Sequence, residues 1–275
     1  MFNANSFKIF CWLPLLAACQ SPAAALPHSE TSETVALDAK HYVAVQRYCA
    51  GPPIAGVLFY QPHENEATAR RATLDVLAAR GQGCLLVLNH DGRRQIHFEA
   101  ADRPARFDPN RIYTAAGRTA TLAQGGNRSE AAQETIAGFA DYLLQHHLRR
   151  AAFIVAVHNN RSGGTDIGSY TRGALAEDTA AVFINPAHSP DDYFYTTDEA
   201  AFAYFKSRGF NVMLQNNHRV RDDGSLSVYA ARHGIGYINV EARHGHAAEQ
   251  RDPTRRCARA RRDEALMADI ERVWN

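Results

Sequence analysis

The sequence predicts an α/β fold: a single domain with a central, mostly parallel (mixed) twisted sheet and helices on both faces. The first observation is length, since 275 residues and 30.4 kDa suit one large domain. The second is composition, because 45% of residues are hydrophobic and 21% charged, and no compositional change marks a second domain. The third is that short apolar runs alternate with segments of helical periodicity, which is typical of buried parallel strands.

The first half of the domain contains two predicted strands with a helix between them. Residues 54–60 and 84–88 are short apolar runs and are expected to be buried strands. Residues 66–79 have apolar positions at helical spacing. Residues 89–128 show little periodicity, so we expect a long loop, and a loop of that length in a compact domain is usually functional.

The second half continues this alternation. An amphipathic helix is predicted at 129–150, and a strongly apolar strand follows at 151–157. Thr196 and Glu199 have the spacing of a capping box, which predicts the start of a helix. The remaining expected elements are strands at 182–185, 210–214 and 237–240, and helices at 196–208 and 263–274.

The N-terminus is predicted to direct export. Residues 1–18 combine a lysine, a short apolar run and small residues, which is typical of a signal peptide. Leu16-Ala17-Ala18-Cys19 resembles the bacterial lipobox, in which the cysteine is lipidated; the alternative is a plain signal peptide with an incidental cysteine. By the same resemblance, Gln20 favours the outer membrane of a Gram-negative bacterium, facing the periplasm. Residues 19–38 are predicted to be a flexible tether, which leaves 39–275 as the folded domain.

Three cysteines lie beyond this tether, and two of them can pair in an oxidising compartment. Cys84 opens an apolar run and is expected to be a buried free thiol. Cys49 and Cys257 flank the domain and are the expected disulfide. The three positions are too scattered for a thiolate zinc site.

The charge balance argues against nucleic acid as a partner. Thirty Lys and Arg face 29 Asp and Glu, a net charge of +1, whereas phosphate binding needs a clustered excess of positive charge.

Metal-ligating residue types stand where predicted strands end. His63 and Glu66 are three residues apart after the strand at 54–60, so an imidazole and a carboxylate can converge on one cation. His158 follows the strand at 151–157 and is placed to be a third ligand. Glu241 follows the strand at 237–240, and a carboxylate there needs a partner or a catalytic role. Ligands of open α/β sheets bind at such strand ends.

Together these residues predict zinc-assisted hydrolysis. Three protein ligands, His63, Glu66 and His158, leave one coordination position of a single zinc ion for water. The metal acidifies that water, and Glu241 can take its proton as a general base.

The ordered motifs resemble the zinc carboxypeptidase superfamily, including its succinylglutamate desuccinylase/aspartoacylase branch and peptidoglycan-peptide carboxypeptidases. The resemblance spans about residues 54–245: His63-x-x-Glu66, then Asp108-Pro109-Asn110-Arg111, then His158-Asn159, then Glu241. It implies that fold, the same zinc ligands and base, and a substrate carboxylate held by Asn110 and Arg111. Arg presents a planar fork that suits a carboxylate.

The chain departs from the family pattern in two places: His63-Glu64-Asn65-Glu66 stands where the desuccinylase branch usually has His-Gly-x-Glu, and Pro109 replaces the common Leu. The sequence does not single out the carbonyl-polarising arginine or the active-site tyrosine of the family. The candidates are Arg93, Arg103, Arg106 and Arg118, and Tyr170, Tyr195, Tyr229 and Tyr237. His244-Gly245-His246 is expected to contact substrate or to be structural.

The leading hypothesis is a lipid-anchored zinc carboxypeptidase that acts on peptidoglycan-derived peptides. A second is deacylation of a small N-acyl amino acid, which also carries a free carboxylate. The others are a solute-binding lipoprotein without catalysis and a structural envelope lipoprotein in which the His-x-x-Glu match is accidental.

Overall fold

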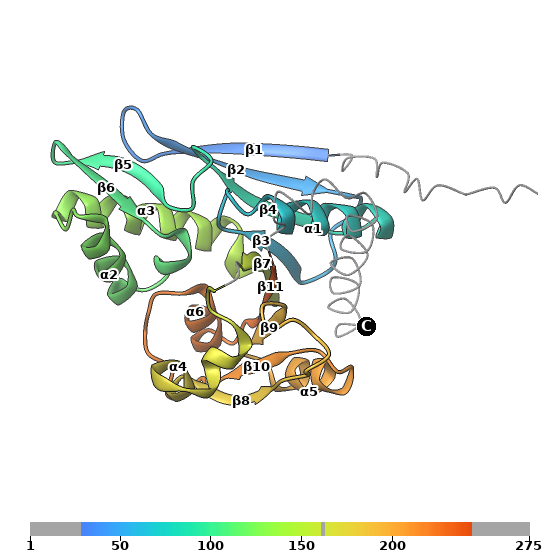
Figure 1. The fold of residues 1–275 in the computed structure, drawn as a ribbon. Coiled ribbons are helices and arrows are strands. Elements are labelled where there is room, and N and C mark those ends of the chain that lie inside the picture. Colours follow the sequence, from blue (N-terminus) through green and yellow to red (C-terminus); the bar gives the residue numbers. More distant parts are fainter. Residues whose placement is uncertain (1–28, 161–162, 244–275) are drawn as a thin grey trace, which may run out of the picture.

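A nine-stranded mixed sheet forms the centre of the computed structural model, which describes residues 29–160 and 163–243. Its strand order is β1-β2-β4-β3-β7-β11-β9-β10-β8, and β5 and β6 form a separate two-stranded sheet (Figure 1). The strands are β1 (Ser29–Ala36), β2 (Tyr42–Cys49), β3 (Val57–Gln61), β4 (Cys84–Asn89), β5 (Ile96–Ala100), β6 (Arg103–Phe107), β7 (Phe153–Asn160), β8 (Thr179–Phe183), β9 (Tyr193–Thr196), β10 (Val212–Gln215) and β11 (Gly236–Arg243). The predicted signal peptide with Cys19, the helix at 263–274 and Cys257 lie outside the described residues.

The middle of the sheet is parallel, as the apolar runs predict. Strands β4, β3, β7 and β11 are successive parallel neighbours. Antiparallel pairs flank this core, with β2 beside β4 and β9 beside β11. Alternate residues of the central strands enter two different cores. Leu58 and Tyr60 pack into one, while Phe59 packs into the other. The predicted α/β fold is therefore confirmed.

Helices cover both faces of the sheet (Figure 1). Side chains of α2, α3 and α6 contribute to the core that contains Tyr60, and those of α1 and α5 to the core that contains Phe59. The helices are α1 (Ala67–Arg80), α2 (Ala115–Gly125), α3 (Glu130–His146), α4 (Gly173–Glu177), α5 (Glu199–Ser207) and α6 (Leu226–Arg232), with 3-10 turns η1 (Pro109–Arg111), η2 (Leu148–Arg150) and η3 (Ile167–Thr171). The predicted capping box at Thr196 is wrong: Thr196 ends β9, and Asp198 caps α5 by accepting a hydrogen bond from Ala201 N at 2.7 Å.

The predicted long loop at 89–128 is wrong, because it contains β5, β6, η1 and α2. The β5–β6 hairpin turns through Ala101 and Asp102, whose φ angles are +50° and +54°. Hairpin turns of this kind usually carry glycine or asparagine, so the turn gave no recognisable signal. These elements fold together, and α2 and β5 pack against α3.

The end of the predicted tether is also wrong, because residues 29–36 form β1. This strand pairs with β2 over eight residues, from Ser29↔Cys49 to Ala36↔Tyr42. An edge strand tolerates polar side chains, which is why its composition resembled that of a linker. Asp38 holds the turn to β2 by accepting hydrogen bonds from the backbone N–H groups of Lys40 and His41.

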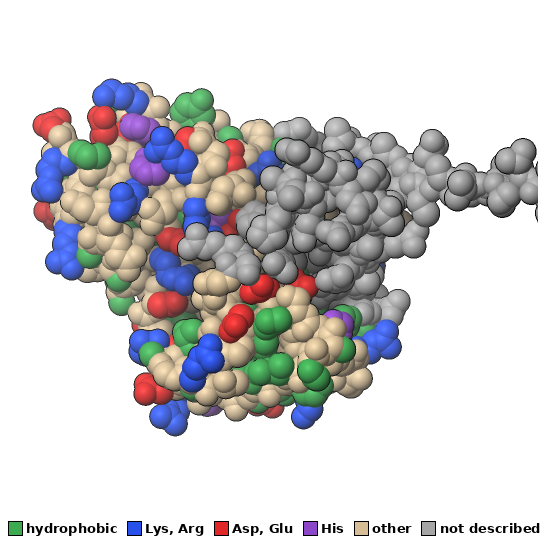
Figure 2. All heavy atoms as spheres, in the orientation of Figure 1, with side chains coloured by type: hydrophobic (Ala, Val, Ile, Leu, Met, Phe, Trp, Pro, Cys, Tyr) green, Lys and Arg blue, Asp and Glu red, His purple; other side chains and the backbone are tan. Residues whose placement is uncertain are grey.

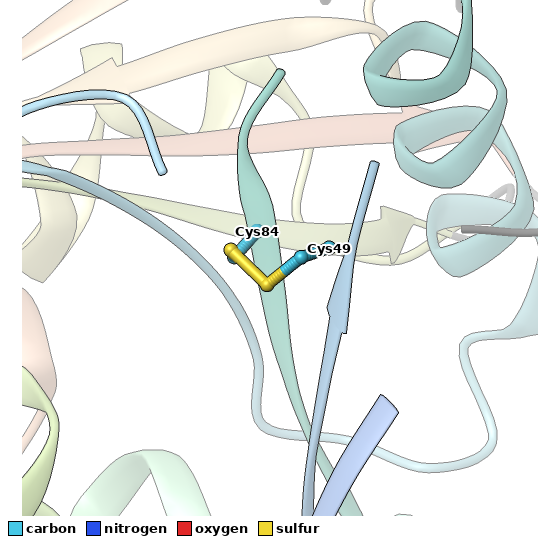
Figure 3. Close-up of a disulfide and its surroundings, with 2 residues drawn as sticks. All are labelled: Cys49 and Cys84. Atoms are coloured by element: carbon cyan, nitrogen blue, oxygen red, sulfur yellow. A yellow bond between two sulfur atoms is a disulfide. The ribbon is translucent and has the colours of Figure 1, made fainter. Parts of the chain in front are cut away.

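The predicted Cys49–Cys257 disulfide is wrong, because Cys49 is bonded to Cys84 (Figure 3). Cys49 on β2 and Cys84 on β4 are direct partners in the antiparallel register, with Cα atoms 4.1 Å apart. Cys84 is therefore no free thiol. The segment after β2 also lies close to the segment before β4, since a Cβ on Gly51 would lie only 2.2 Å from the carbonyl oxygen of Gly81.

Figure 2 shows one face of the molecule, where Lys and Arg side chains are interspersed with Asp and Glu over the described surface. Among the described residues, no helix has both the length and the apolar character needed to cross a membrane.

The disulfide can be tested on the purified oxidised protein. Replacing both Cys49 and Cys84 with Ser should lower the free energy of unfolding by about 2–5 kcal/mol, since the cross-link restricts the unfolded chain. Peptide mapping without reductant should recover the two residues in one cross-linked peptide. Cys257→Ser is the control and should leave that peptide intact; recovery of Cys49 joined to Cys257 would contradict the structure.

Candidate metal and active site

The site lies where the chain reverses its direction of travel across the sheet. From β3 the chain passes through α1 to β4 on one side, and it later returns to β7 on the other side of β3. Open α/β sheets bind ligands in the crevice at such a switch point. His63 follows β3, and His158 lies near the carboxyl end of β7. The predicted placement at strand ends is confirmed.

Three buried side chains converge there, as predicted. His63 Nδ1 is 3.1 Å from Glu66 Oε1 and 3.1 Å from His158 Nδ1. His158 Nδ1 is 2.9 Å from Glu66 Oε2. The side chains are 0%, 1% and 4% exposed for His63, Glu66 and His158, respectively.

This arrangement fits a zinc ion. Two imidazole nitrogens and a carboxylate are a common zinc donor set, and ligand atoms about 2.0–2.2 Å from a tetrahedral metal lie about 3.4 Å from each other. The observed separations of 2.9–3.1 Å between nitrogen and oxygen atoms are close to that spacing. One cation placed between His63, Glu66 and His158 would relieve the direct approach of the two ring nitrogens.

Asp108 orients the first of these ligands. Its Oδ1 lies 2.8 Å from His63 Nε2, and the Nε2–H tautomer of His63 donates to it. That tautomer leaves the lone pair of Nδ1 facing His158 and Glu66. Carboxylates commonly orient metal-binding histidines in this way. The motif that contains Asp108 does not indicate this role, because the contact joins residues 45 positions apart in the sequence.

Side chains from neighbouring elements fix the turn between His63 and Glu66. Gln61 Nε2 donates to the backbone carbonyls of His63 and Glu66 at 3.0 and 2.7 Å. Asn159 Oδ1, on β7, accepts a hydrogen bond from Ala69 N at the start of α1. Because Asn159 performs this capping, the Glu66 side chain is left to face the two histidines.

The electrostatics of the cluster keep its carboxylates ionised. Burial opposes the charge of Glu66, but the fields of His158 and His63 hold its pKa well below the ordinary value. Burial likewise opposes the charge of Asp108, but the hydrogen bond from His63 holds its pKa low. Burial disfavours a charged His63, yet the field of Glu66 raises its pKa. Both carboxylates are therefore charged, which is the form of the group that binds a cation.

Glu241 lies beside the triad. It is the parallel-register partner of His158 on the neighbouring strand, and Asn239 Nδ2 donates to its Oε1 at 3.0 Å. Burial raises the pKa of Glu241; the field of His158 opposes this shift and that of Glu66 adds to it. Its carboxyl group therefore accepts a proton more readily than an exposed one. The predicted His244-Gly245-His246 contact lies outside the described residues.

A cavity of about 240 Å³ joins the triad to the predicted substrate-binding residues. His158, Glu241, Asn110 and Arg111 all line it. The tyrosines on its wall are Tyr170, Tyr193, Tyr195 and Tyr237. Three of the four predicted tyrosines thus face the cavity, whereas Tyr229 binds Arg149 instead. Burial raises the pKa of Tyr170 to about 12 and raises those of the other three, so all four are neutral hydrogen-bond donors.

Asn110 and Arg111 reach the cavity from η1, the turn that begins at Asp108. Asn110 Oδ1 accepts a hydrogen bond from Leu226 N at 3.2 Å, so this side chain also fixes the start of α6. Arg111 Nη1 donates to the carbonyl of Asn110 at 2.8 Å, and its Nε lies 3.4 Å from Asp223 Oδ2.

Arg94 and Arg221 line the cavity, and neither was among the arginines predicted from the sequence. Arg221 is paired with Asp178, whereas Arg94 Nη1 donates to Glu66 Oε1 at 2.5 Å. None of the four predicted arginines lines this cavity. They bind Asp91 (Arg93) and the backbone carbonyls of Gly126 (Arg103), Gln124 (Arg106) and Ile112 (Arg118). No local signal distinguishes Arg94 from Arg93, because the choice depends on the path of the chain before β5.

No protein-family model matches the sequence, and no curated protein matches it. Among solved structures, the chain is similar to murein-tripeptide amidase MpaA from Escherichia coli O157, at 12% identity over 87% of this chain and 93% of that chain, with a TM-score of 0.41. It is similar to succinylglutamate desuccinylase from Chromobacterium violaceum, at 13% identity over 86% and 70% of the two chains, with a TM-score of 0.44. A succinylglutamate desuccinylase/aspartoacylase from Rhodobacter sphaeroides is 14% identical over 77% and 57%, with a TM-score of 0.37. The likeness is one of fold.

The role of Asp108 can be tested through metal affinity. Asp108→Asn should weaken zinc binding about 10–100-fold, because the neutral amide no longer fixes and polarises His63. Competition with a chelator of known affinity measures the change. Asp75→Asn is the matched control, since it removes a carboxylate that is paired with Arg71 on α1; equal affinities for the two variants would refute the role.

Proposed function

We propose that this chain is a zinc-dependent amide hydrolase whose substrate carries a free carboxylate. The observation that carries the proposal is that His158, a member of the buried His63–Glu66–His158 triad, lines the same cavity as Glu241 and Arg111. One crevice thus combines the proposed metal ligands, the proposed general base Glu241 and the arginine proposed to bind the carboxylate, Arg111.

His63, Glu66 and His158 would hold the ion, whose chemistry is to acidify a water molecule and polarise an amide carbonyl. Glu241 accepts the proton of the attacking water and delivers it to the nitrogen of the leaving amine. Asn239 orients the Glu241 carboxylate for this transfer. Arg111 binds the substrate carboxylate and so places the amide against Glu241.

The proposed substrates are peptidoglycan-derived peptides, on which the enzyme would act as a carboxypeptidase. A second candidate is deacylation of a small N-acyl amino acid, and the small size of the cavity favours it, since typical ligand pockets are about 300–1,000 Å³. Digestion of purified peptidoglycan fragments and of N-acyl amino acids, followed by mass spectrometry, separates the two. Chelator should abolish either activity, and added zinc should restore it.

The proposed location is the periplasmic side of the outer membrane, with a lipid anchor on Cys19. The support is the lipobox-like Leu16-Ala17-Ala18-Cys19. Cys19→Ser should move the protein from the membrane fraction to the soluble fraction. A wild-type protein that is already soluble would disprove the anchor and leave the proposed chemistry untouched.

Glu241→Gln tests the catalytic assignment. The amide keeps the shape of the side chain but cannot take a proton, so turnover should fall about 10²–10⁴-fold while bound zinc stays stoichiometric. Steady-state kinetics and metal analysis of the same preparation measure both. Hydrolysis at the wild-type rate would show that another group is the base.

Arg111→Ala tests carboxylate binding. The contact exists in both the ground state and the transition state, so the variant should raise KM at least as clearly as it lowers kcat. Amidation of the substrate carboxylate should impair the wild type strongly and the variant little. Equal sensitivity of both enzymes to amidation would exclude Arg111 as the carboxylate site.

A further inference from the structure

Arg111 does not face the cavity alone, because Asp223 lies beside it. Both side chains line the cavity, and they are 40% and 47% exposed. Their closest atoms, Arg111 Nε and Asp223 Oδ2, are 3.4 Å apart, longer than the 2.7–2.9 Å of a tight charged hydrogen bond. One cation and one anion are therefore presented together to a ligand.

The backbone is built to keep these two charges adjacent. A Cβ on Gly224 would lie 2.4 Å from Gly117 Cα and 2.5 Å from the carbonyl oxygen of Arg111, so the segments touch through glycine alone. Tyr113 N donates to Gly224 O at 3.0 Å across the same contact. The loop that carries Asp223 is thereby fixed against the turn that carries Arg111.

Among the acidic residues near Arg111, Asp223 is the one with a carboxylate oxygen available to a ligand in the cavity. Asp222 is engaged by Thr114 Oγ1, Gly224 N and Arg232. On the cavity wall, Asp178 is likewise engaged by the backbone N–H and the guanidinium of Arg221. Asp223 uses Oδ1 to accept from Ser225 N at 2.9 Å, which leaves Oδ2 facing Arg111 and the cavity.

A half-exposed ion pair of this kind contributes little to the stability of the fold. A ligand that offers both an anion and a cation can therefore insert between the partners at little cost, and it satisfies both charges at once. A carboxylate alone would satisfy Arg111 but would place a second negative charge beside Asp223.

We propose that Asp223 binds the ammonium group of the substrate end whose carboxylate is bound by Arg111, so that the recognised group is a free 2-amino carboxylate. This rests on the proposed function and narrows its substrate class. The nitrogen on the α-carbon of this group is a free ammonium, so it is not the nitrogen of the amide that is cleaved. The amide that is cleaved is then formed through another functional group of the same residue, such as a side-chain amine. An ordinary C-terminal residue, whose α-nitrogen is the scissile nitrogen, lacks the ammonium.

Three small probes separate these features: Nε-acetyl-lysine, which keeps the zwitterion; Nα,Nε-diacetyl-lysine, which lacks the ammonium; and Nε-acetyl-lysinamide, which lacks the carboxylate. Titration calorimetry with the zinc-loaded full chain measures binding, and release of acetate measures hydrolysis. We expect the first probe to bind about tenfold or more tightly than either of the others, since each loses one charged hydrogen bond.

Asp223→Asn should remove the preference for the free ammonium and leave the affinity for Nα,Nε-diacetyl-lysine equal or higher. Asp102→Asn, which removes an exposed charge on the distant β5–β6 turn, is the control and should keep the wild-type preference. A wild type that binds the mono- and diacetylated probes equally, or an Asp223→Asn variant that keeps the preference, overturns the proposal. The wild-type comparison needs no variant to fold. Binding selectivity without hydrolysis would count against the proposed function alone, and hydrolysis without selectivity against Asp223 alone.

Discussion

The charge of Glu66 is the constraint on which the arrangement of the site depends. Its side chain is 1% exposed, and a carboxylate cannot be buried without partners because desolvation disfavours the charged form strongly. Here His63, His158 and Arg94 all approach its two oxygens. A bound cation would answer the same requirement. Burying an unpaired charge costs far more than one hydrogen bond contributes, so these partners must come together when the chain folds.

Meeting that constraint requires three separate parts of the chain. Strand β3 delivers His63 and Glu66 through one tight turn, β7 delivers His158 beside them, and the segment between β4 and β5 delivers Arg94. Parallel pairing of β3 with β7 and of β7 with β11 sets these strand ends in register, and it brings Glu241 next to His158. The order of strands in the sheet therefore also sets the order in which these side chains lie along the site.

The sequence predicted what depends on local pattern and on strand ends. The long apolar runs of β4 and β7 predicted buried parallel strands. His63, Glu66 and His158 could be grouped as candidate ligands because they follow apolar runs of this kind. Contacts between distant segments gave no signal. The Cys49–Cys84 bond depends on the register of two antiparallel strands, and β1 reads as a linker because an edge strand tolerates polar residues. Asp108 contacts His63 only because β6, which it follows, ends beside that histidine.

The turn η1 links the two ends of the cavity. Asp108 caps this turn by accepting a hydrogen bond from Asn110 N at 2.8 Å, and the same oxygen binds His63. Arg111 is the last residue of the turn, and Asn110 between them binds the start of α6. A single 3-10 turn, fixed at both ends, therefore sets the separation between the His63–Glu66–His158 triad and the Arg111–Asp223 pair. Because neither end can shift without disturbing the other, the relative position of the two groups in the cavity is set by one short segment of the chain.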